Sequence, residues 1–257
     1  MFTDQLSNHI KIITPPKRII SIVPSQTELL FYLGLSDNIV GVTKFCIHPN
    51  EYFKTKPFVG GTKQLNFDLL HSLNPDLIIA NKEENTLSDI LELQKHYPVW
   101  ISDVNNLVDA LDMIISIGMI TDTEVKSQKL VTEIKAKFDS LLNQQKHTAA
   151  YLIWNEPMMV AANNTFINEM LSYAGFSNVF KNRVRYPVIS EKDLSDQKPD
   201  FILLSSEPYP FKEKHKLYIE KIFPNSKVKI VDGEMFSWYG NRLLLSADYF
   251  KDLNLSF

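Results

Sequence analysis

The sequence predicts an α/β protein of two lobes with mostly parallel sheets, joined by one long helix. Three observations indicate this fold: short β-branched runs alternate with helical patterns, one unbroken amphipathic stretch lies near the middle, and the first half of the pattern recurs in the second. With 257 residues the chain is long enough for two domains of ordinary size.

In the first half, apolar runs are followed by helical patterns. Continuous apolar runs of this length are typical of parallel strands that are buried on both faces. The predicted strands are Ile19–Val23, Leu77–Ala80 and Val99–Ile101, and the predicted helices are Glu28–Leu33, Leu87–Leu93 and Leu107–Ile117. Capping boxes are expected from Ser25 to Glu28 and from Thr121 to Glu124, where the first side chain accepts a free amide and the glutamate reaches back.

The middle of the chain predicts one long helix. Residues 124–145 contain no Gly or Pro, and the apolar side chains in this stretch fall on one helical stripe. About 22 residues at 1.5 Å each would span roughly 33 Å. The predicted domains are therefore an N-terminal lobe (1–120), a connecting helix (121–146) and a C-terminal lobe (147–257). In the last, strands are expected at Ala150–Trp154, Phe201–Leu204 and Val228–Val231, and helices at Ile167–Ala174, Leu217–Phe223 and Arg242–Phe250.

The two halves also resemble each other in sequence. The stretch from Glu28 to Ile39 parallels that from Glu169 to Val179, and the stretch from Leu70 to Glu83 parallels that from Leu194 to Glu207. The order of the matches favours a duplicated lobe, although short α/β patterns can also converge.

The first half carries an extra segment. Gly34 and Asp76 are 42 positions apart whereas Gly175 and Asp200 are 25 apart, a surplus of 17 that falls at Thr43–Lys63. Insertions between repeated elements tend to form loops on one face, often the binding face. Ligands of open α/β sheets lie at the carboxyl ends of strands, so this loop, Lys82–Asn85 and Ser205–Phe211 are predicted to line one site.

Composition excludes several classes of protein. The 27 basic and 30 acidic residues give a net charge of −3, which offers no basic surface for nucleic acid. A single cysteine, Cys46, rules out an intramolecular disulfide. No apolar stretch approaches the roughly 20 residues of a membrane span. Residues 1–13 lack a signal-peptide pattern, so the chain as written is expected to be cytoplasmic, or periplasmic or envelope-associated if an export signal was removed.

Two short motifs in the extra segment could contact a ligand. Cys46 and His48 are both of a type that binds transition metals, but a structural zinc site needs four ligands. Loop packing, contact with a bound ligand or its metal, and catalysis all remain open for this pair. Gly60 to Lys63 could bring amides and an ammonium to an anionic group, or could be a turn with a solvated lysine.

Aromatic and Met side chains gather in predicted loops of the second half, among polar residues and prolines. Such surfaces suit a bulky, flat, partly apolar ligand, although the loops could also be packed by their own aromatics. The aromatic and Met side chains in these loops are Trp154, Met158, Met159, Tyr186, Tyr209, Phe211, Met235, Phe236, Trp238 and Tyr239.

The sequence shows no catalytic pattern of a nucleophile, a base and an orienting acid, so an enzyme is not expected. An enzyme would have to use Cys46, His48 and the loop acids.

Six stretches of the chain carry motifs of a known family: Arg18 to Leu29, Leu33 to Gly34, Val40 to Val42, Val59 to Gly61, Leu73 to Ile79 and Lys198 to Asp200. Together they resemble the helical-backbone metal-receptor family, the class III substrate-binding proteins of ABC importers for cobalamin, ferric siderophores and haem. The resemblance is closest to the cobalamin-binding branch.

This resemblance implies two Rossmann-like lobes joined by a backbone helix, with the ligand held between the lobes and no chemistry performed. It implies no intrinsic cofactor, and a corrinoid as ligand, with a ferric siderophore or haem as the alternative. It further implies a monomer that docks to the membrane subunits of an ABC importer. A cytoplasmic protein that binds or processes a corrinoid or other metal chelate stays open as an alternative.

Two positions depart from the cobalamin-binding branch. Lys63 stands where that branch carries a Trp, which would suit a changed or more anionic ligand. For importer docking, Asp68 matches the first acidic position, whereas the second is Lys192 with Glu191 beside it. No direct metal ligand is expected, with Cys46 and His48 as the only candidates. The predicted ligand contacts are Phe45, Cys46, His48, Thr62, Lys63, Lys82 and Glu83 in the first lobe, and Trp154, Tyr186, Glu207, Tyr209, Trp238 and Arg242 in the second.

Overall fold

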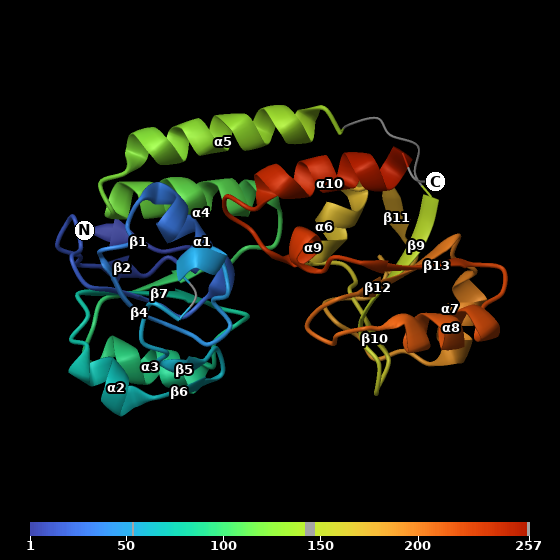
Figure 1. Ribbon diagram of the computed structural model, residues 1–257, viewed down its shortest axis with the longest axis horizontal. Helices are drawn as coiled ribbons and strands as arrows, with labels where there is room; N and C mark the ends of the chain where they lie inside the picture. The colour runs from blue at the N-terminus through green and yellow to red at the C-terminus, as the bar shows by residue number, and fades with distance from the viewer. Residues whose placement is uncertain (53, 142–146, 256–257) are drawn as a thin grey trace. The chain divides into compact units, whose positions relative to one another are not determined.

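The computed structural model describes residues 1–52, 54–141 and 147–255 (Figure 1). Contacts within the chain divide it into two compact units. Unit 1 comprises Met1–Val104, Val108–Glu133 and Tyr239–Arg242. Unit 2 comprises Asn105–Leu107, Ile134–Trp238 and the residues from Leu243 on. The α/β class with parallel sheets is confirmed.

Unit 1 contains a four-stranded parallel sheet of order β4-β3-β7-β8. Helices α1 and α4 lie on one side of this sheet, and α2 and α3 on the other (Figure 1). The strands are β3 (Ile19–Ser21), β4 (Ile39–Val42), β7 (Leu77–Asn81) and β8 (Val99–Ser102), with the small pairs β1 (Phe2–Thr3) and β2 (His9–Ile10), and β5 (Gly60–Gly61) and β6 (Gln64–Leu65). The helices are α1 (Pro24–Leu33), α2 (Phe67–Ser72), α3 (Leu87–Gln94), α4 (Leu107–Ile120) and α5 (Glu124–Asp139), with a 3-10 turn at Asn50–Tyr52.

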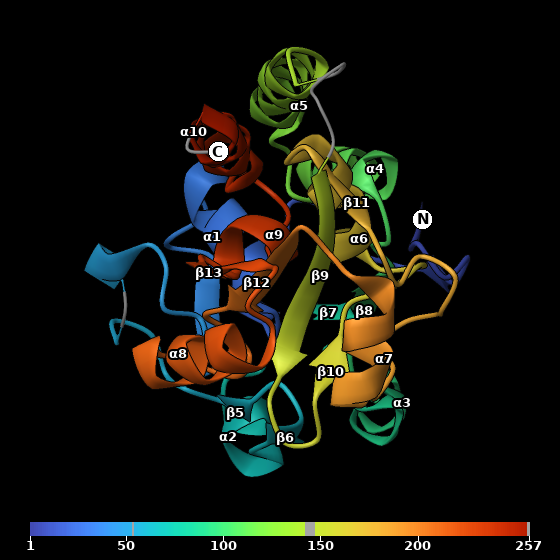
Figure 2. The same cartoon turned by 90° about the vertical axis from the view of Figure 1, so that its right-hand side faces the viewer.

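Unit 2 contains a sheet in which β11, β9, β12 and β13 are parallel and β10 is antiparallel to β9. Helices α6 and α9 lie on one face, and α7 and α8 on the other (Figure 2). The strands are β9 (His147–Trp154), β10 (Met159–Val160), β11 (Phe176–Asn178), β12 (Phe201–Ser205) and β13 (Lys227–Val231). The helices are α6 (Phe166–Tyr173), α7 (Glu191–Gln197), α8 (Glu213–Ile222), α9 (Glu234–Ser237) and α10 (Leu243–Leu255).

The duplication predicted from sequence is confirmed by topology. The orders β4-β3-β7-β8 and β11-β9-β12-β13 are the same when each unit is numbered along the chain. Gly34 and Gly175 end equivalent helices with φ of 91° and 81°, a left-handed backbone that favours glycine. Asp76 accepts the N–H groups of Lys17 and Arg18, and Asp200 accepts the N–H of Thr148, so each aspartate ties a third strand to the start of the first.

Alternate side chains of each sheet form its core. In unit 1, Ile20, Ile78 and Ile101 pack against Leu70 of α2 and Leu93 of α3. The equivalent core of unit 2 packs β9, β12 and β13 against α7 and α8 through Leu152, Ile202, Val228, Leu194 and Ile219. Because these strands have helices on both sides, both of their faces are apolar, as the continuous runs in the sequence predicted.

The long helix is shorter than predicted. Helix α5 ends at Asp139, and Ser140 turns away: its N–H and its hydroxyl both donate to the Lys137 carbonyl, at 3.2 and 2.6 Å. Residues 142–145 of the predicted helix lie outside the described residues. The contact division falls within α5, after Glu133, whereas the domain limits at 120 and 146 remain a prediction.

Both predicted capping boxes are wrong. Helix α1 begins at Pro24, which has no N–H to cap, and its N-cap Val23 makes no side-chain bond. The Thr121 hydroxyl donates to the Ile117 carbonyl at the end of α4, and α5 begins only at Glu124. A capping box does form at Ser190 of α7, through Asp193. Within the described ranges, no helix is both long and apolar enough to span a membrane.

Candidate functional site

The carboxyl end of the unit 1 sheet is organised by a network around Asn81, the last residue of β7. Its amide oxygen accepts the N–H groups of Glu83 and Glu84 at 2.8 and 3.0 Å, and its amide nitrogen donates to Ser102 Oγ at 2.9 Å. Asn85 donates to the Thr62 carbonyl at 2.9 Å. The loop 82–85 is thereby fixed to β8 and to the 60–65 hairpin.

Cys46 and His48, the two motif residues of the extra segment, differ in exposure. Cys46 is 4% exposed, and its sulfur lies 3.1 Å from Thr27 Oγ1 and 3.2 Å from Thr43 Oγ1. Burial raises the pKa of this thiol, which opposes the reactive thiolate form. His48 is partly exposed. Among the described residues, no three His, Cys, Asp or Glu side chains are grouped so as to hold a metal ion.

Phe45 and Lys44 present an exposed surface next to this thiol. The Phe45 ring is 49% exposed, and the Lys44 ammonium lies 5.2 Å from its centroid. A Cβ at Gly61 would come within 3.2 Å of the ring, so the glycine permits this close approach. The pair combines a flat apolar surface with a cation.

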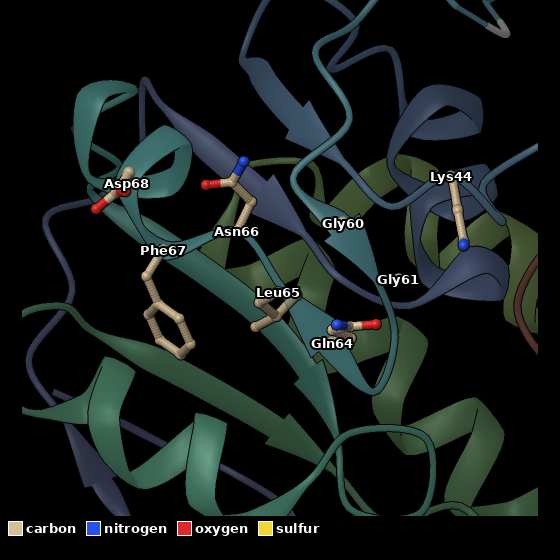
Figure 3. Close-up of a pocket in the computed structure, with 8 residues that line it drawn as sticks. All are labelled: Lys44, Gly60, Gly61, Gln64, Leu65, Asn66, Phe67 and Asp68. Carbon is tan, nitrogen blue, oxygen red and sulfur yellow. The ribbon is translucent and has the colours of Figure 1, made fainter.

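A cavity of about 530 Å³ lies beside the β5–β6 hairpin (Figure 3). Lys44 and Asp68 stand at opposite sides of it, so both charges are represented in the lining (Figure 3). Lys63 does not line it, and its ammonium donates to the Glu83 carbonyl at 3.2 Å. The lining consists of Lys44, Gly60, Gly61, Gln64, Leu65, Asn66, Phe67 and Asp68.

Lys82 and Arg242 are each engaged by a carboxylate of unit 1. The Lys82 ammonium lies 2.5 Å from Asp103, in an exposed pair. Arg242 is 5% exposed and binds Glu28 through two bonds, Nε to Oε2 at 2.8 Å and Nη2 to Oε1 at 3.0 Å. The Arg242 guanidinium therefore has a structural partner and little surface for a ligand.

Trp154 and Tyr209 form a partly exposed aromatic surface in unit 2. Trp154, the last residue of β9, is 38% exposed, and its indole N–H donates to the Glu156 carbonyl at 3.0 Å. The Tyr209 ring meets the indole at 5.5 Å between centroids, in an edge-to-face contact. Tyr209 also packs against Phe211 and His215, so the pair rests on a fixed base.

Glu207 lies at the carboxyl end of β12, two residues before Tyr209. Its Oε1 accepts the Ser237 hydroxyl at 2.6 Å and the Trp238 indole N–H at 2.9 Å. Burial raises the pKa of this carboxyl, and these two hydrogen bonds oppose the rise. Trp238 itself is 7% exposed, so its ring packs inside unit 2.

The remaining predicted residues lie elsewhere on their units. Tyr186 is partly exposed, with the Arg185 guanidinium 5.4 Å from its ring. Glu191 is exposed at the first turn of α7 and accepts the Tyr218 hydroxyl at 3.2 Å, while the neighbouring Lys192 pairs with Asp196 at 2.7 Å.

Three candidate residues were not predicted. Lys44 lies within the extra segment, and its place beside the aromatic Phe45 is a signal that could have found it. Asn81 directly follows a predicted strand, which is the usual place of a site residue. Tyr239 is a loop aromatic in the sequence but not a predicted ligand contact; it is 5% exposed with its hydroxyl 3.4 Å from Glu84, a partner 155 residues away that no local pattern indicates.

Comparison with known proteins identifies the family. A family model described as periplasmic binding protein matches residues 19–226. The vitamin B12-binding protein of Photorhabdus laumondii is 25% identical over 241 residues, 91% of this chain and 86% of that protein. An uncharacterized ABC transporter substrate-binding lipoprotein of Bacillus subtilis, YvrC, is 27% identical over 213 residues, 78% of this chain and 67% of that protein.

A solved structure shares the fold. The periplasmic vitamin B12 binding protein BtuF of Vibrio cholerae superposes with a TM-score of 0.81 at 21% identity, over 94% of this chain and 98% of that one. At this identity the likeness concerns the fold, whereas the family model covers most of the sequence as well. The two duplicated α/β units described above are thus those of a known architecture, and the chain belongs to the periplasmic binding protein family.

Proposed function

We propose that this protein binds a corrinoid and delivers it to an ABC-type importer. As a member of a binding-protein family, it is a solute carrier and not an enzyme. The observation that carries the ligand class is the exposed indole of Trp154, held by its N–H and braced by Tyr209 at the carboxyl end of a parallel sheet. A fixed, flat, half-exposed aromatic suits a flat macrocycle. The vitamin B12-binding relative supports the same class.

Burial divides the predicted contacts into two groups. Those with accessible surface are proposed to touch the chelate: Phe45, His48, Thr62, Lys63, Lys82 and Glu83 in unit 1, and Trp154, Tyr186, Glu207 and Tyr209 in unit 2. Cys46, Trp238 and Arg242 are each less than a tenth exposed, so we propose that they support the site from behind.

An anionic chelate, a ferric siderophore or haem, is the second candidate. It is favoured by the exposed ammonium groups of Lys44 and Lys63 in the extra segment of unit 1. Lys63 stands where the cobalamin-binding branch carries an aromatic side chain, and a lysine attracts carboxylates where an indole would stack.

Calorimetric titration of the pure protein with cobalamin, cobinamide, haem and ferric siderophores tests both candidates, with visible spectra as a second readout. Binding of cobinamide or cobalamin supports the first, and binding of an iron chelate alone supports the second. Trp154→Ala should lose roughly 1–3 kcal/mol, or about 5- to 150-fold in affinity, by analogy with bases stacked on aromatics. Lys129→Ala, on the exposed face of α5, is the control and should bind normally. If no chelate binds, the proposal is wrong.

Partner docking is proposed at Asp68 and Glu191, both of which are exposed. The proposed partner is the membrane subunits of an ABC importer. Docking to them requires the protein to work outside the cytoplasm. We further propose that it does so as a monomer. Asp68→Lys should weaken capture by those subunits in detergent without changing the affinity for the chelate. Unchanged capture would rule out this surface, and cell fractionation and gel filtration test the location and the monomer.

A further inference from the structure

Glu207 is a carboxylate that is already fixed before any ligand binds. Two donors, the Ser237 hydroxyl at 2.6 Å and the Trp238 indole N–H at 2.9 Å, meet on the same oxygen, Oε1. Both donors come from α9 and the residue after it, and the short segment 205–207 is tied by the Glu207 N–H to Ser205 Oγ at 3.4 Å. The orientation of the carboxylate is therefore set by the fold.

The second oxygen of Glu207 is left for another donor. In the part of the chain that the structure describes, no side chain or backbone group donates to Oε2, and no cation pairs with this carboxylate. Glu207 is partly exposed. The carboxylates of Asp232 and Glu234, before and within α9, lie near enough to raise the pKa of Glu207. An oxygen in these surroundings attracts a hydrogen-bond donor or a positive group and repels an anion.

The neighbouring aromatic surface determines what kind of donor could reach it. Tyr209 follows Glu207 by two residues, its N–H donates to the Ile153 carbonyl at 3.4 Å, and its ring contacts Trp154. The two rings stand at 62° to each other, so a flat ligand can stack on one of them, and its edge groups are then the ones available to side chains beside that ring, such as Glu207. The groups on the edge of the chelate are then the ones that Glu207 selects.

We propose that Glu207 is a specificity-determining residue, which favours chelates whose edge donates hydrogen bonds and opposes chelates whose edge carries carboxylates. This inference rests on the proposed function. The edge of a corrinoid carries carboxamides, whose N–H groups can donate to Oε2. The edge of haem carries propionates, which would bring a second negative charge to a carboxylate that has already lost part of its hydration.

A matched pair of corrinoids tests the selection directly. Dicyanocobinamide and dicyanocobyrinic acid share the corrin ring and the cobalt, and differ chiefly in carrying carboxamides or carboxylates at the edge. At pH 7 the wild type should bind the amide form more tightly. Glu207→Gln keeps an oxygen for Ser237 and Trp238 but removes the charge, so it should weaken cobinamide binding by roughly 10- to 150-fold. Because it also removes the repulsion, binding of the carboxylate form should strengthen.

Glu213→Gln, which removes an exposed carboxylate at the start of α8 in the same unit, should leave the ratio of the two affinities unchanged. A second measurement needs no variant. Lowering the pH from about 7 toward 5 begins to neutralise Glu207, whose surroundings include Asp232, Glu234 and the Tyr151 phenol, and should narrow the ratio in the wild type.

The outcomes separate this inference from the function on which it rests. If the wild type binds neither corrinoid, both the corrinoid function and this role of Glu207 are wrong. If it binds them but Glu207→Gln, folded by circular dichroism, keeps the wild-type ratio, only the selection is wrong. Should the variant not fold, an affinity ratio of the wild type that is constant with pH overturns the selection by itself.

Discussion

Removing one partner of the Glu28–Arg242 ion pair should strongly destabilise unit 1. The two side chains are 10% and 6% exposed, and both guanidinium bonds are close to ideal length, at 2.8 and 3.0 Å. A lone charge left in such a place loses its partner without regaining water. Breaking buried pairs of this kind costs about 3–5 kcal/mol, whereas exposed pairs contribute roughly 0–1 kcal/mol.

Three variants separate the ion pair from simple loss of packing. Arg242→Met leaves the Glu28 carboxylate buried, Glu28→Met leaves the Arg242 guanidinium buried, and the double variant leaves neither. Each single variant should lose about 3–5 kcal/mol in the free energy of unfolding, and the double variant should recover about 2 kcal/mol or more relative to the sum of the two. Lys192→Met, which breaks an exposed pair on α7, should cost less than about 0.5 kcal/mol.

Urea unfolding followed by tryptophan fluorescence gives the required resolution. Trp100 lies in unit 1 and is fully buried, whereas Trp154 and Trp238 lie in unit 2. With Trp154→Phe and Trp238→Phe as the common background, the signal reports unit 1, and far-ultraviolet circular dichroism reports the whole chain. Single variants that lose less than about 1 kcal/mol, or losses that simply add in the double variant, would refute the reasoning.

Three further predictions concern the surroundings of single residues. Iodoacetamide should alkylate Cys46 of the folded protein at least roughly tenfold more slowly than in urea, because burial raises the thiol pKa; equal rates would contradict this. The Ser190 hydroxyl lowers the pKa of Asp193 to about 2, so Asp193→Asn should reduce the melting temperature at neutral pH. That difference should close as the pH falls from about 4 through the folded-state pKa, and a gap constant with pH would count against it. A Cβ at Gly118 would lie 2.1 Å from Ser127 Oγ, so Gly118→Ala should cost about 1–3 kcal/mol in thermal unfolding and adding Ser127→Gly should restore it.

Local patterns in the sequence were sufficient for six strands, β3, β7, β8, β9, β12 and β13, and for the duplication, whereas β4, β10 and β11 were not among the predicted strands. The runs at Leu77–Ala80 and Phe201–Leu204 became β7 and β12 with one residue added to each, because burial on both faces leaves a continuous apolar signal. Helix starts were less well predicted. The pattern from Ser25 to Glu28 resembles a capping box, but the Glu28 carboxylate accepts hydrogen bonds from Arg242, which lies 214 positions away in the sequence. No local window contains that information.

In the candidate site, too, some features follow from local sequence and others depend on distant partners. The loops that hold it were predicted, because they follow the carboxyl ends of strands whose positions were known. Which side chains within those loops reach solvent was not predictable, since exposure depends on distant partners. Cys46 is buried and contacts Thr27, and Trp238 is buried and donates a hydrogen bond to Glu207. Phe45 and Trp154, by contrast, are exposed.

Glu28 and Glu169 occupy equivalent places in the two repeats, and each binds a segment that is remote in sequence. Glu28 binds the Arg242 side chain, and Glu169 accepts the backbone N–H of Leu107, at the start of α4. By contacts, Tyr239–Arg242 belongs to unit 1 although unit 2 surrounds it in the sequence, and Asn105–Leu107 belongs to unit 2 in the same reciprocal way.

The contacts made by Glu28 in unit 1 and by Glu169 in unit 2, here called the two anchors, constrain the sequence differently. A backbone N–H is present at position 107 for every residue except proline, so the contact in unit 2 requires its glutamate but no particular side chain at position 107. The anchor of unit 1 requires the glutamate and also an arginine, because its donor is a side chain. The repeat is therefore visible in sequence at the two glutamates and not at their partners, and a substitution at position 242 should be far less tolerated than one at position 107 that keeps its apolar character.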